Sequence, residues 1–208
     1  MKNTELPINS PFNRRLKRGF DCIFSLLFLI ILFPVLYIII GTVIKLTSPG
    51  PIMFKQLRTG RDGKDFVCYK FRSMKMNMDA DFRQASLGDE RITRLGKFLR
   101  KSNLDEFPQF WNVLKGDMSV VGPRPHMLKH TEEYSAQLDS YTDRLLVKPG
   151  ITGWAQVSGF RGEIREYEQL EGRVMCDLWY IRNWTFLLDL KIIYLTVKNI
   201  FEGEENAY

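Results

Sequence analysis

The feature that most constrains the fold is an apolar run from about Phe20 to Ile44, interrupted by Pro34. A helix of about 24 residues is roughly 36 Å long, enough to cross the hydrocarbon core of a bilayer. Basic residues lie before the run (14–18) and at its close (Lys45), so the positive-inside rule does not place its ends on opposite sides. Pro34 costs about 3 kcal/mol inside an uninterrupted helix. These features favour a re-entrant helix-break-helix hairpin, and a single membrane span remains the alternative.

The run also fixes the domain organisation that we expect. It is too long for a signal peptide, and no small-residue cleavage site precedes the next polar segment. We therefore predict a flexible leader over residues 1–13, a re-entrant membrane segment over 14–46 and one cytosol-facing domain over 47–208. The turn Ser48-Pro-Gly-Pro51 separates the last two.

The segment after that turn predicts a β-hairpin in an otherwise helical, α+β domain. Residues 52–56 and 65–72 are typical of two short strands, and 59–63 of the turn between them. Alternation along the second strand places Lys70 and Arg72 on one face, where two cations could bind a phosphate. The alternative is an edge strand protected by charge.

Charge and cysteine content indicate the partners and the compartment. The 208 residues carry a formal net charge of +6, with much of the excess in residues 14–18 and 56–100, so we expect anionic partners. A nucleic-acid partner is disfavoured because no aromatic stacking platform accompanies the basic residues. A basic collar against anionic membrane lipid, over residues 91–101, fits better. Three widely spaced cysteines without a CxxC pair indicate reduced thiols.

Two adjacent carboxylates, Asp105 and Glu106, stand out in this basic neighbourhood. Ser102 and Asp105 have capping-box spacing, which predicts that Ser102 is a helix N-cap and that Asp105 lies in the first turn. The helix dipole would keep such a carboxylate ionised. An ionised carboxylate can attack phosphorus or help to hold Mg²⁺ against a diphosphate. Alternatively, these acids only stabilise a helix start.

Other segments carry weaker signals. Arg124 lies between two prolines, which suits bidentate phosphate contact, although a solvated arginine in a rigid turn is the alternative. His126 and His130 have helical spacing and are expected to form a surface pair rather than a zinc site. Helical periods occur over 74–83, 92–101, 109–114 (ended by Gly116), 163–177 and after Asp189. The last stretch is rich in aromatic residues that suit either a membrane interface or a core helix, namely Trp179, Tyr180, Trp184 and Tyr194.

Several of these segments, taken in order, closely resemble the bacterial sugar transferase family, the monotopic phosphoglycosyl transferases. The resemblance covers the chain from about Arg14 to Phe201. The blocks that carry it are Lys70-Phe-Arg-Ser-Met74, Ser102-Asn-Leu-Asp-Glu106, Gly116-Asp-Met-Ser-Val-Val-Gly-Pro-Arg-Pro125, Lys148-Pro-Gly-Ile-Thr-Gly-Trp-Ala-Gln-Val157, Asp177-Leu-Trp-Tyr-Ile181 and Leu188-Asp-Leu-Lys191.

The resemblance implies a bacterial inner-membrane enzyme that faces the cytoplasm. Such an enzyme moves a sugar-1-phosphate from a UDP-sugar to polyprenyl (undecaprenyl) phosphate, releases UMP and starts a cell-surface glycan. By position, Asp105 is implied to be the nucleophile that forms an aspartyl–phosphosugar intermediate, and Glu106 its partner in holding Mg²⁺. Lys70, Arg72, Arg100 and Arg124 are expected to bind the phosphates and nucleotide of the donor.

Two departures qualify the resemblance. Small members commonly carry Ser-Pro at the membrane break, where this sequence has Phe33-Pro34. Larger members add a multi-span region and a further soluble domain, which this sequence does not show. The block Ser158-Gly-Phe-Arg-Gly-Glu163 nevertheless looks more like the larger hexose-phosphate transferases, so UDP-glucose or UDP-galactose is the expected donor. A non-catalytic scaffold that binds anionic lipid or partner proteins is the alternative function, and the sequence is silent on oligomeric state.

Overall fold

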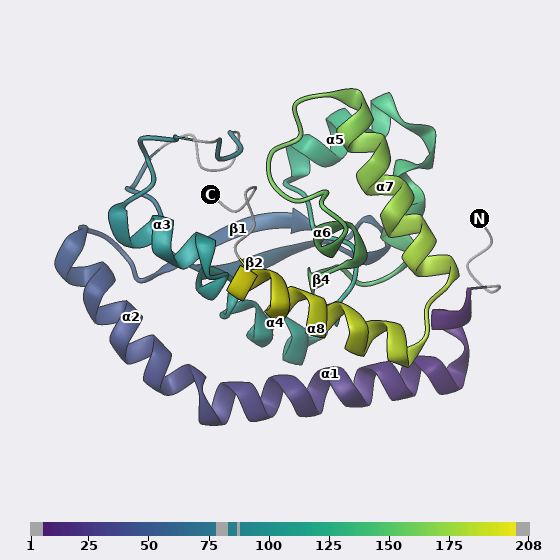
Figure 1. Cartoon of the computed structure of the whole chain (residues 1–208), viewed down its shortest axis with the longest axis horizontal. Coiled ribbons are helices and arrows are strands. Elements are labelled where there is room, and N and C mark those ends of the chain that lie inside the picture. The colour runs from purple at the N-terminus through teal and green to yellow at the C-terminus, as the bar shows by residue number, and fades with distance from the viewer. Residues whose placement is uncertain (1–5, 78–82, 87, 203–208) are drawn as a thin grey trace.

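The computed structural model describes residues 6–77, 83–86 and 88–202. Its most prominent feature is a bent pair of helices, α1 (Pro11–Ile31) and α2 (Phe33–Thr47), which runs along one side of the molecule (Figure 1). The two axes meet at 56°. Pro34 lies in the first turn of α2, where its missing N–H removes no helical hydrogen bond. Within the described residues, no single helix is both long and apolar enough to cross a membrane, whereas the two helices of the bent pair together have the length and composition of a span.

The N-terminal segment differs from the flexible leader expected over residues 1–13. A short 3₁₀ helix, η2 (Pro7–Asn9), precedes α1, and Ser10 accepts a hydrogen bond from the Asn13 N–H. Leu6 and Ile8 are buried in the main core. Burial of these two side chains therefore orders residues 6–13, and residues 1–5 lie outside the described part.

The two small sheets lie in the body of the molecule. Strands β1 (Met53–Thr59) and β2 (Asp65–Phe71) are antiparallel and are joined through η3 (Arg61–Gly63), which confirms the predicted hairpin. Strands β3 (Ser119–Val121) and β4 (Gly150–Thr152) form a parallel pair. A Cβ on Gly150 would lie 2.1 Å from the Gly122 nitrogen, so this close approach requires glycine.

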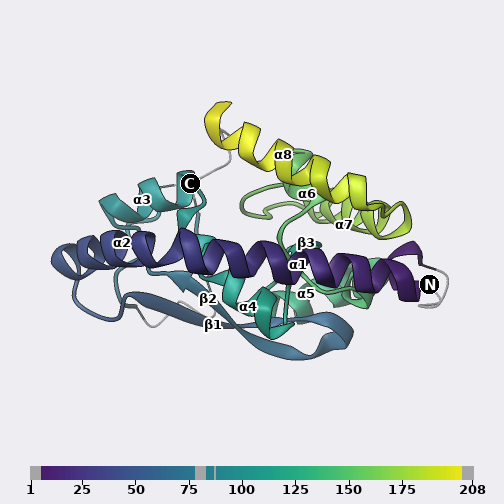
Figure 2. The same ribbon diagram turned by 90° about the horizontal axis from the view of Figure 1, so that it is seen from below.

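Helices make up most of the remaining body, in agreement with the predicted α+β class. Figure 2 shows α8 (Phe186–Glu202) on one side of α1 and the β1–β2 hairpin on the other. The remaining helices are α3 (Arg94–Lys101), η4 (Leu104–Glu106), α4 (Gln109–Lys115), α5 (Leu128–Gln137), η5 (Asp139–Leu146), α6 (Trp154–Val157), α7 (Tyr167–Arg182) and α8 (Phe186–Glu202).

Helix α1 is part of the core as well as part of the bent pair. Lys17 is buried and its Nζ lies 2.6 Å from Asp189 Oδ2 on α8. Asp21 Oδ1 accepts hydrogen bonds from the Ser119 hydroxyl and the Val120 N–H, both at 3.0 Å. These buried polar contacts satisfy charges that would otherwise be costly. They join α1 to β3 and α8.

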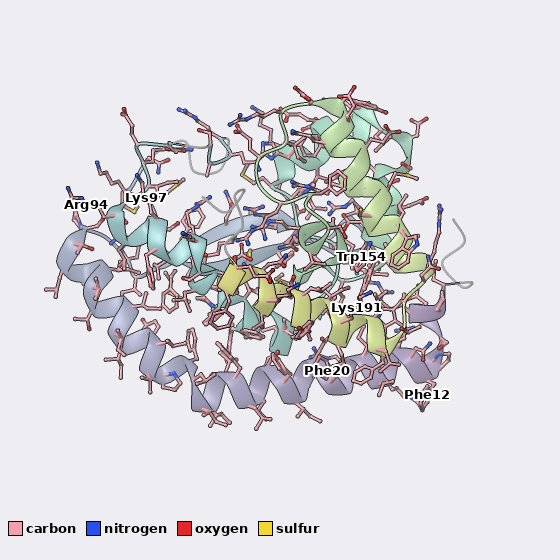
Figure 3. All side chains as sticks on the ribbon, in the orientation of Figure 1. Phe12, Phe20, Arg94, Lys97, Trp154 and Lys191 are labelled. Carbon is pink, nitrogen blue, oxygen red and sulfur yellow. The ribbon has the colours of Figure 1, made fainter. Side chains whose placement is uncertain are left out.

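The outer face of the bent pair is strongly apolar. Lys and Arg are absent from α2 up to Lys45, and Figure 3 shows side chains projecting from the outer side of both helices. An exposed apolar surface of this extent marks an interaction with lipid or protein. The large side chains exposed there are Ile23, Leu26, Leu27, Ile30, Ile31, Leu32, Val35, Ile38, Ile39 and Leu46.

Two predictions about the polar stretches are corrected, and the two interpretations of the aromatic stretch are distinguished. Of the helix expected over 74–83, residues 74–77 and 83 are not helical, and 78–82 lie outside the described part. Met74 instead forms a β-bridge with Ile92. The helix expected from residue 163 begins at Tyr167. Tyr180 and Trp184 are core residues rather than interface residues, whereas Trp179 and Tyr194 are exposed.

Candidate active site

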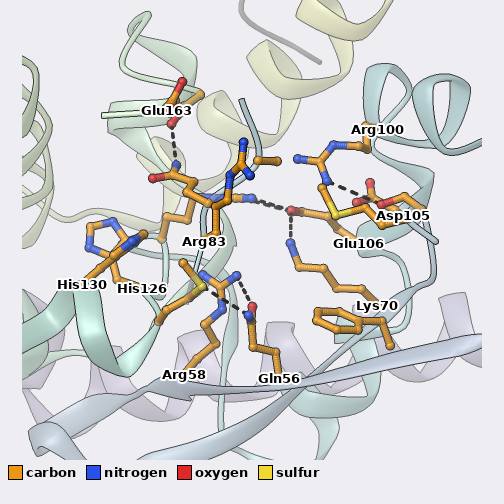
Figure 4. Close-up of a pocket in the computed structure, with 18 of the residues that line it drawn as sticks. Gln56, Arg58, Lys70, Arg83, Arg100, Asp105, Glu106, His126, His130 and Glu163 are labelled. Atoms are coloured by element: carbon orange, nitrogen blue, oxygen red, sulfur yellow. Dashed lines mark hydrogen bonds and ion pairs between the residues drawn. The ribbon is translucent and has the colours of Figure 1, made fainter. Parts of the chain in front are cut away.

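A cavity opens between the β1–β2 hairpin, the η4 turn, the segment after β3, and helices α5 and α7. Its lining is strongly basic. Among the described residues that line it, nine are Lys or Arg and three are carboxylates. Such an excess of positive charge attracts an anionic ligand. The two adjacent acids singled out in the sequence lie here (Figure 4).

A tight reversal after α3 places these acids. Ser102 ends α3 instead of starting a helix, since its hydroxyl donates to the Phe98 and Leu99 carbonyls at 2.8 and 3.2 Å. The predicted capping box is therefore wrong. Asn103 follows with a left-handed backbone (φ 59°), which Asn tolerates better than most residues. The η4 turn then buries Asp105 and Glu106, which are 6% and 7% exposed.

Glu106 is held by two cations. Its Oε1 lies 2.7 Å from Lys70 Nζ and 2.6 Å from Arg124 Nη2, and its Oε2 accepts from Arg124 Nη1 at 3.2 Å. Burial opposes ionisation, but the charges of Arg124 and Lys70 outweigh it and hold the pKa of Glu106 well below its usual range. Glu106 is therefore a fixed carboxylate with a fixed orientation.

Asp105 has a different environment. Among the residues that the structure describes, its carboxylate makes neither a hydrogen bond nor an ion pair. Burial and the negative charge of Glu106 raise the pKa of Asp105, against the opposing charges of Lys70, Arg100 and Arg124. The dipole-stabilised carboxylate expected from the sequence is thus not what the fold provides. The fold provides a carboxylate whose oxygens are uncommitted, as a nucleophile requires.

The two adjacent carboxylates of the cavity are of the type that binds Mg²⁺. Mg²⁺ commonly takes one or two carboxylates together with substrate phosphates. Asp105 and Glu106 could supply those carboxylates. No cluster of three or more potential metal ligands occurs among the described residues, so substrate oxygens would complete the coordination.

The cations predicted for the site divide into two groups. Lys70 and Arg124 contact Glu106, and Arg100 lines the same cavity with its Nη1 3.5 Å from Ser73 Oγ. Arg72 is 4% exposed, and its guanidinium donates to the carbonyls of Ser48 and Pro49. Alternation alone grouped Arg72 with Lys70. In the structure its guanidinium instead joins the end of β2 to the end of α2 through these hydrogen bonds.

A buried network behind Arg124 was missed by the sequence analysis. Arg144 pairs with Asp177 at 2.6 Å and also donates to the Arg124 carbonyl at 2.8 Å. Its Nη1 lies 3.1 Å from His126 Nδ1. His126 is buried, so the predicted surface pair of histidines is wrong. The Asp177 block was noticed as a motif. Nothing in the sequence connected it with Arg144, which lies 33 residues earlier.

A loop from the C-terminal half also reaches the site. Arg161 donates to Asn103 Oδ1, beside the η4 turn, and lines the cavity. Phe160 in the same loop packs on Gly172, where a Cβ would lie 2.3 Å from the ring. The block 158–163, noted in the sequence for its likeness to hexose-phosphate transferases, therefore borders the cavity.

Comparison with known proteins gives consistent matches. The family described as bacterial sugar transferase matches residues 12–203. A UDP-glucose:undecaprenyl-phosphate glucose-1-phosphate transferase of Escherichia coli K12 is 51% identical over 95% of this chain and 42% of its own length. The protein of that name from Caulobacter vibrioides is 44% identical over 92% of this chain and 72% of its own length. A UDP-N-acetylgalactosamine-undecaprenyl-phosphate N-acetylgalactosaminephosphotransferase of Aeromonas hydrophila is 42% identical over 93% of this chain.

This chain spans about two-fifths of the length of the first curated relatives it matches. The matched region nevertheless includes every residue of the cavity described above. The resemblance found in the sequence is thereby confirmed, and the chain belongs to the bacterial sugar transferase family.

Proposed function

We propose that this chain transfers a sugar-1-phosphate from a UDP-sugar to polyprenyl phosphate and releases UMP. The observation that carries the proposal is that two adjacent carboxylates in a basic cavity have different environments. Glu106 is held by Lys70 and Arg124, whereas the oxygens of Asp105 are uncommitted among the described residues. The names of relatives at 40–52% identity support the reaction class. Those names include glucose, galactose and N-acetylgalactosamine phosphotransferases. UDP-glucose or UDP-galactose remains our proposed donor.

The reaction that we propose has two displacements at one phosphorus. An Asp105 oxygen attacks the β-phosphorus of the donor, and the bond to the bridging oxygen breaks, so that UMP leaves with that electron pair. A polyprenyl phosphate oxygen then attacks the same phosphorus and displaces Asp105 as a free carboxylate. Both steps bring anions together, and Lys70, Arg100 and Arg124 reduce the repulsion. Bound Mg²⁺ would supply further neutralisation of the diphosphate through Asp105 and Glu106.

We further propose that the bent pair is the re-entrant membrane segment and that the site faces the cytoplasm of the bacterial cell. The apolar outer face of α1 and α2 supports this, and so does the 56° bend. Arg94 and Lys97, on α3, lie near the end of α2 in Figure 3 and suit contact with anionic headgroups. Arg72 ties the end of α2 to β2, which carries Lys70. This contact would hold the cavity close to the lipid surface.

The test is intact-protein mass after incubation of the full chain in detergent with Mg²⁺ and UDP-glucose or UDP-galactose, without lipid. A hexose-phosphate increment that is absent in Asp105→Asn supports the covalent mechanism and identifies a donor. Asp62→Asn is a matched control, since Asp62 lies at the exposed tip of the hairpin with a left-handed backbone that Asn accepts.

UMP release after addition of polyprenyl phosphate completes the test. Normal turnover by Asp105→Asn would overturn the role of Asp105. The competing proposal, a non-catalytic scaffold, predicts no UMP release with any UDP-sugar and lipid binding that falls with salt.

A further inference from the structure

The cavity extends well beyond the two acids. Figure 4 shows Asp105, Glu106, Lys70 and Arg100 on one side of it and His126 and His130 on the other. We call the second side the α5/α7 end. Its lining comes from β1, the segment after β3, α5 and α7, and includes Gln56, His126, His130, Tyr134 and Arg173.

His126 brings a buried hydrogen-bond donor to this end. Arg144 Nη1 lies 3.1 Å from His126 Nδ1, and a guanidinium can only donate, so Nδ1 is the acceptor. Burial and the charge of Arg144 also hold the pKa of His126 well below its usual range. The ring is therefore neutral, and its proton is on Nε2. The His126 side chain lines the cavity, and Nε2 is buried without a partner among the described residues.

Arg173 brings a buried positive charge to the same end. It is 5% exposed, and the hydrogen bond that the structure shows for it runs from Nη2 to the Gly162 carbonyl at 2.9 Å. Its Nε has no partner among the described residues. Burial and repulsion from Arg124 and Arg144 lower the pKa of Arg173 to about 10, so it remains charged near neutrality. The carboxylate of Asp177 offsets part of this charge but is itself paired with Arg144. Because buried charge is normally compensated, Arg173 suits an additional anionic ligand.

The chemistry of the proposed donor indicates which part of it suits this end. The transferred hexose is uncharged, whereas the leaving nucleotide carries phosphate oxygens and base carbonyls that accept hydrogen bonds. In an in-line displacement, the leaving group departs on the side opposite the nucleophile, and Asp105 lies on the far side from His126. Arg124 lies between, since its side chain contacts Glu106 while its carbonyl contacts Arg144.

We propose that the α5/α7 end is the subsite for the uridine monophosphate part of the donor. Arg173 binds its phosphate or ribose oxygens, and His126 Nε2–H donates to one of its acceptor oxygens. The assignment rests on the proposed function and adds to it the orientation of the donor in the cavity. The nucleotide lies toward α5 and α7. After UMP departs, the polyprenyl phosphate oxygen attacks from the same side, opposite Asp105.

The test is calorimetric binding of UMP to the full chain in detergent, which requires no turnover. Loss of a charge-assisted hydrogen bond should weaken UMP binding by about tenfold or more in Arg173→Gln. His126→Asn keeps an acceptor for Arg144 but removes the donor, and should weaken binding by about three- to tenfold. His126→Gln, which can place an N–H near the Nε2 position, should bind nearly as the wild type does. Lys129→Gln, on the exposed side of α5, is the matched control and should be unchanged.

A second measurement avoids substitutions. Photolabelling of the wild-type chain with 5-azido-UMP, followed by peptide mapping, should label residues of α5, α7 or the segment 122–126. Labelling confined to α3 and η4 would overturn the assignment. So would absence of UMP binding by the wild type, or wild-type affinity in both Arg173→Gln and His126→Asn.

Glucose 1-phosphate as a second calorimetric ligand separates the two parts of the donor. Loss of glucose 1-phosphate binding in the variants, with UMP binding intact, would reverse the proposed orientation of the donor.

Failure of the proposed function would give a different result from failure of the subsite. UMP binding that depends on Arg173 and His126, without covalent labelling by any UDP-sugar and without UMP release, would overturn the reaction and leave the nucleotide subsite.

Discussion

Asp105 and Glu106 are adjacent and almost equally buried, yet among the described residues only Glu106 is paired with cations. The difference follows from the η4 turn, which directs one carboxylate toward Lys70 and Arg124. The charges of Lys70 and Arg124 act on both acids, but only Glu106 also accepts their hydrogen bonds, and the pKa values of the two acids move in opposite directions. Such a split separates a nucleophile from an orienting partner.

The raised pKa of Asp105 predicts the acid limb of the pH–rate profile. Attack requires the ionised carboxylate, so the rate of covalent labelling should fall as pH drops through the raised pKa, at a pH above the ordinary value of 3.8. Additional Mg²⁺ should move the limb to lower pH, since a nearby cation favours ionisation. Rapid-quench labelling between pH 4 and 8 measures this, with circular dichroism at each pH as the control for folding. A rate that is flat down to pH 4 would contradict it.

Glu106 predicts a pH-dependent loss of stability. Its pKa is lowered on folding, so its contribution is present above the unfolded value of 4.5 and is lost as pH falls through the lower folded value. Glu106→Gln leaves Lys70 and Arg124 unpaired and should cost roughly 3 kcal/mol at pH 7. Thermal unfolding should also show a smaller decrease below pH 4.5 in this variant than in the wild type. Glu202→Gln, in an exposed pair at the end of α8, should behave as the wild type does.

The Arg144–Asp177 pair predicts that stability and activity can be separated. Asp177→Asn leaves a buried guanidinium without its counter-ion and should destabilise the fold by about 3–5 kcal/mol. Arg144→Met combined with Asp177→Leu should recover most of this stability. It should not recover activity, because the bond from Arg144 to the Arg124 carbonyl is lost. Denaturant unfolding and UMP release are the measurements, and wild-type turnover by the double variant would show that Arg124 needs no such support.

The bent pair predicts that both of its ends lie on one side of the membrane. In a variant with Cys22, Cys68 and Cys176 replaced, single cysteines at Phe12 and Lys64 should both react with an impermeant maleimide in inverted vesicles. Neither should react in right-side-out vesicles. Both positions are exposed; Phe12 lies in the first turn of α1, and Lys64 follows the end of α2. Reaction of the two from opposite sides would establish a single span instead.

The sequence predicted features that depend on neighbouring residues. The break near Pro34, the β1–β2 hairpin and the end of α4 at Gly116 all follow from local backbone preferences. Local patterns also singled out two adjacent acids and two cations, the family motifs implied their roles, and the structure brings them together. These residues are Asp105, Glu106, Lys70 and Arg124.

Features that depend on distant contacts were not predicted. The Ser102–Asp105 spacing fits a helix start, but the Ser102 hydroxyl turns back to α3. The segment containing Gly150 resembles a turn, yet it pairs with β3 as a parallel strand. Alternation placed Arg72 with Lys70, and only the fold shows that the backbone of Ser48 and Pro49 lies within its reach. Alternation within one strand cannot show that backbone carbonyls from a distant segment will accept the hydrogen bonds of a side chain.

The polar contacts of α1 also bear on the order in which the chain can assemble. Synthesis proceeds from the N-terminus, so α1 leaves the ribosome first. The partner of Asp21 follows 98 residues later and that of Lys17 follows 172 residues later. Until α8 has been made, Lys17 has no ion-pair partner at Asp189. The contacts of α1 therefore depend on α8, the last helix. A chain truncated before Asp189 should leave Lys17 without its ion pair and α1 less firmly packed.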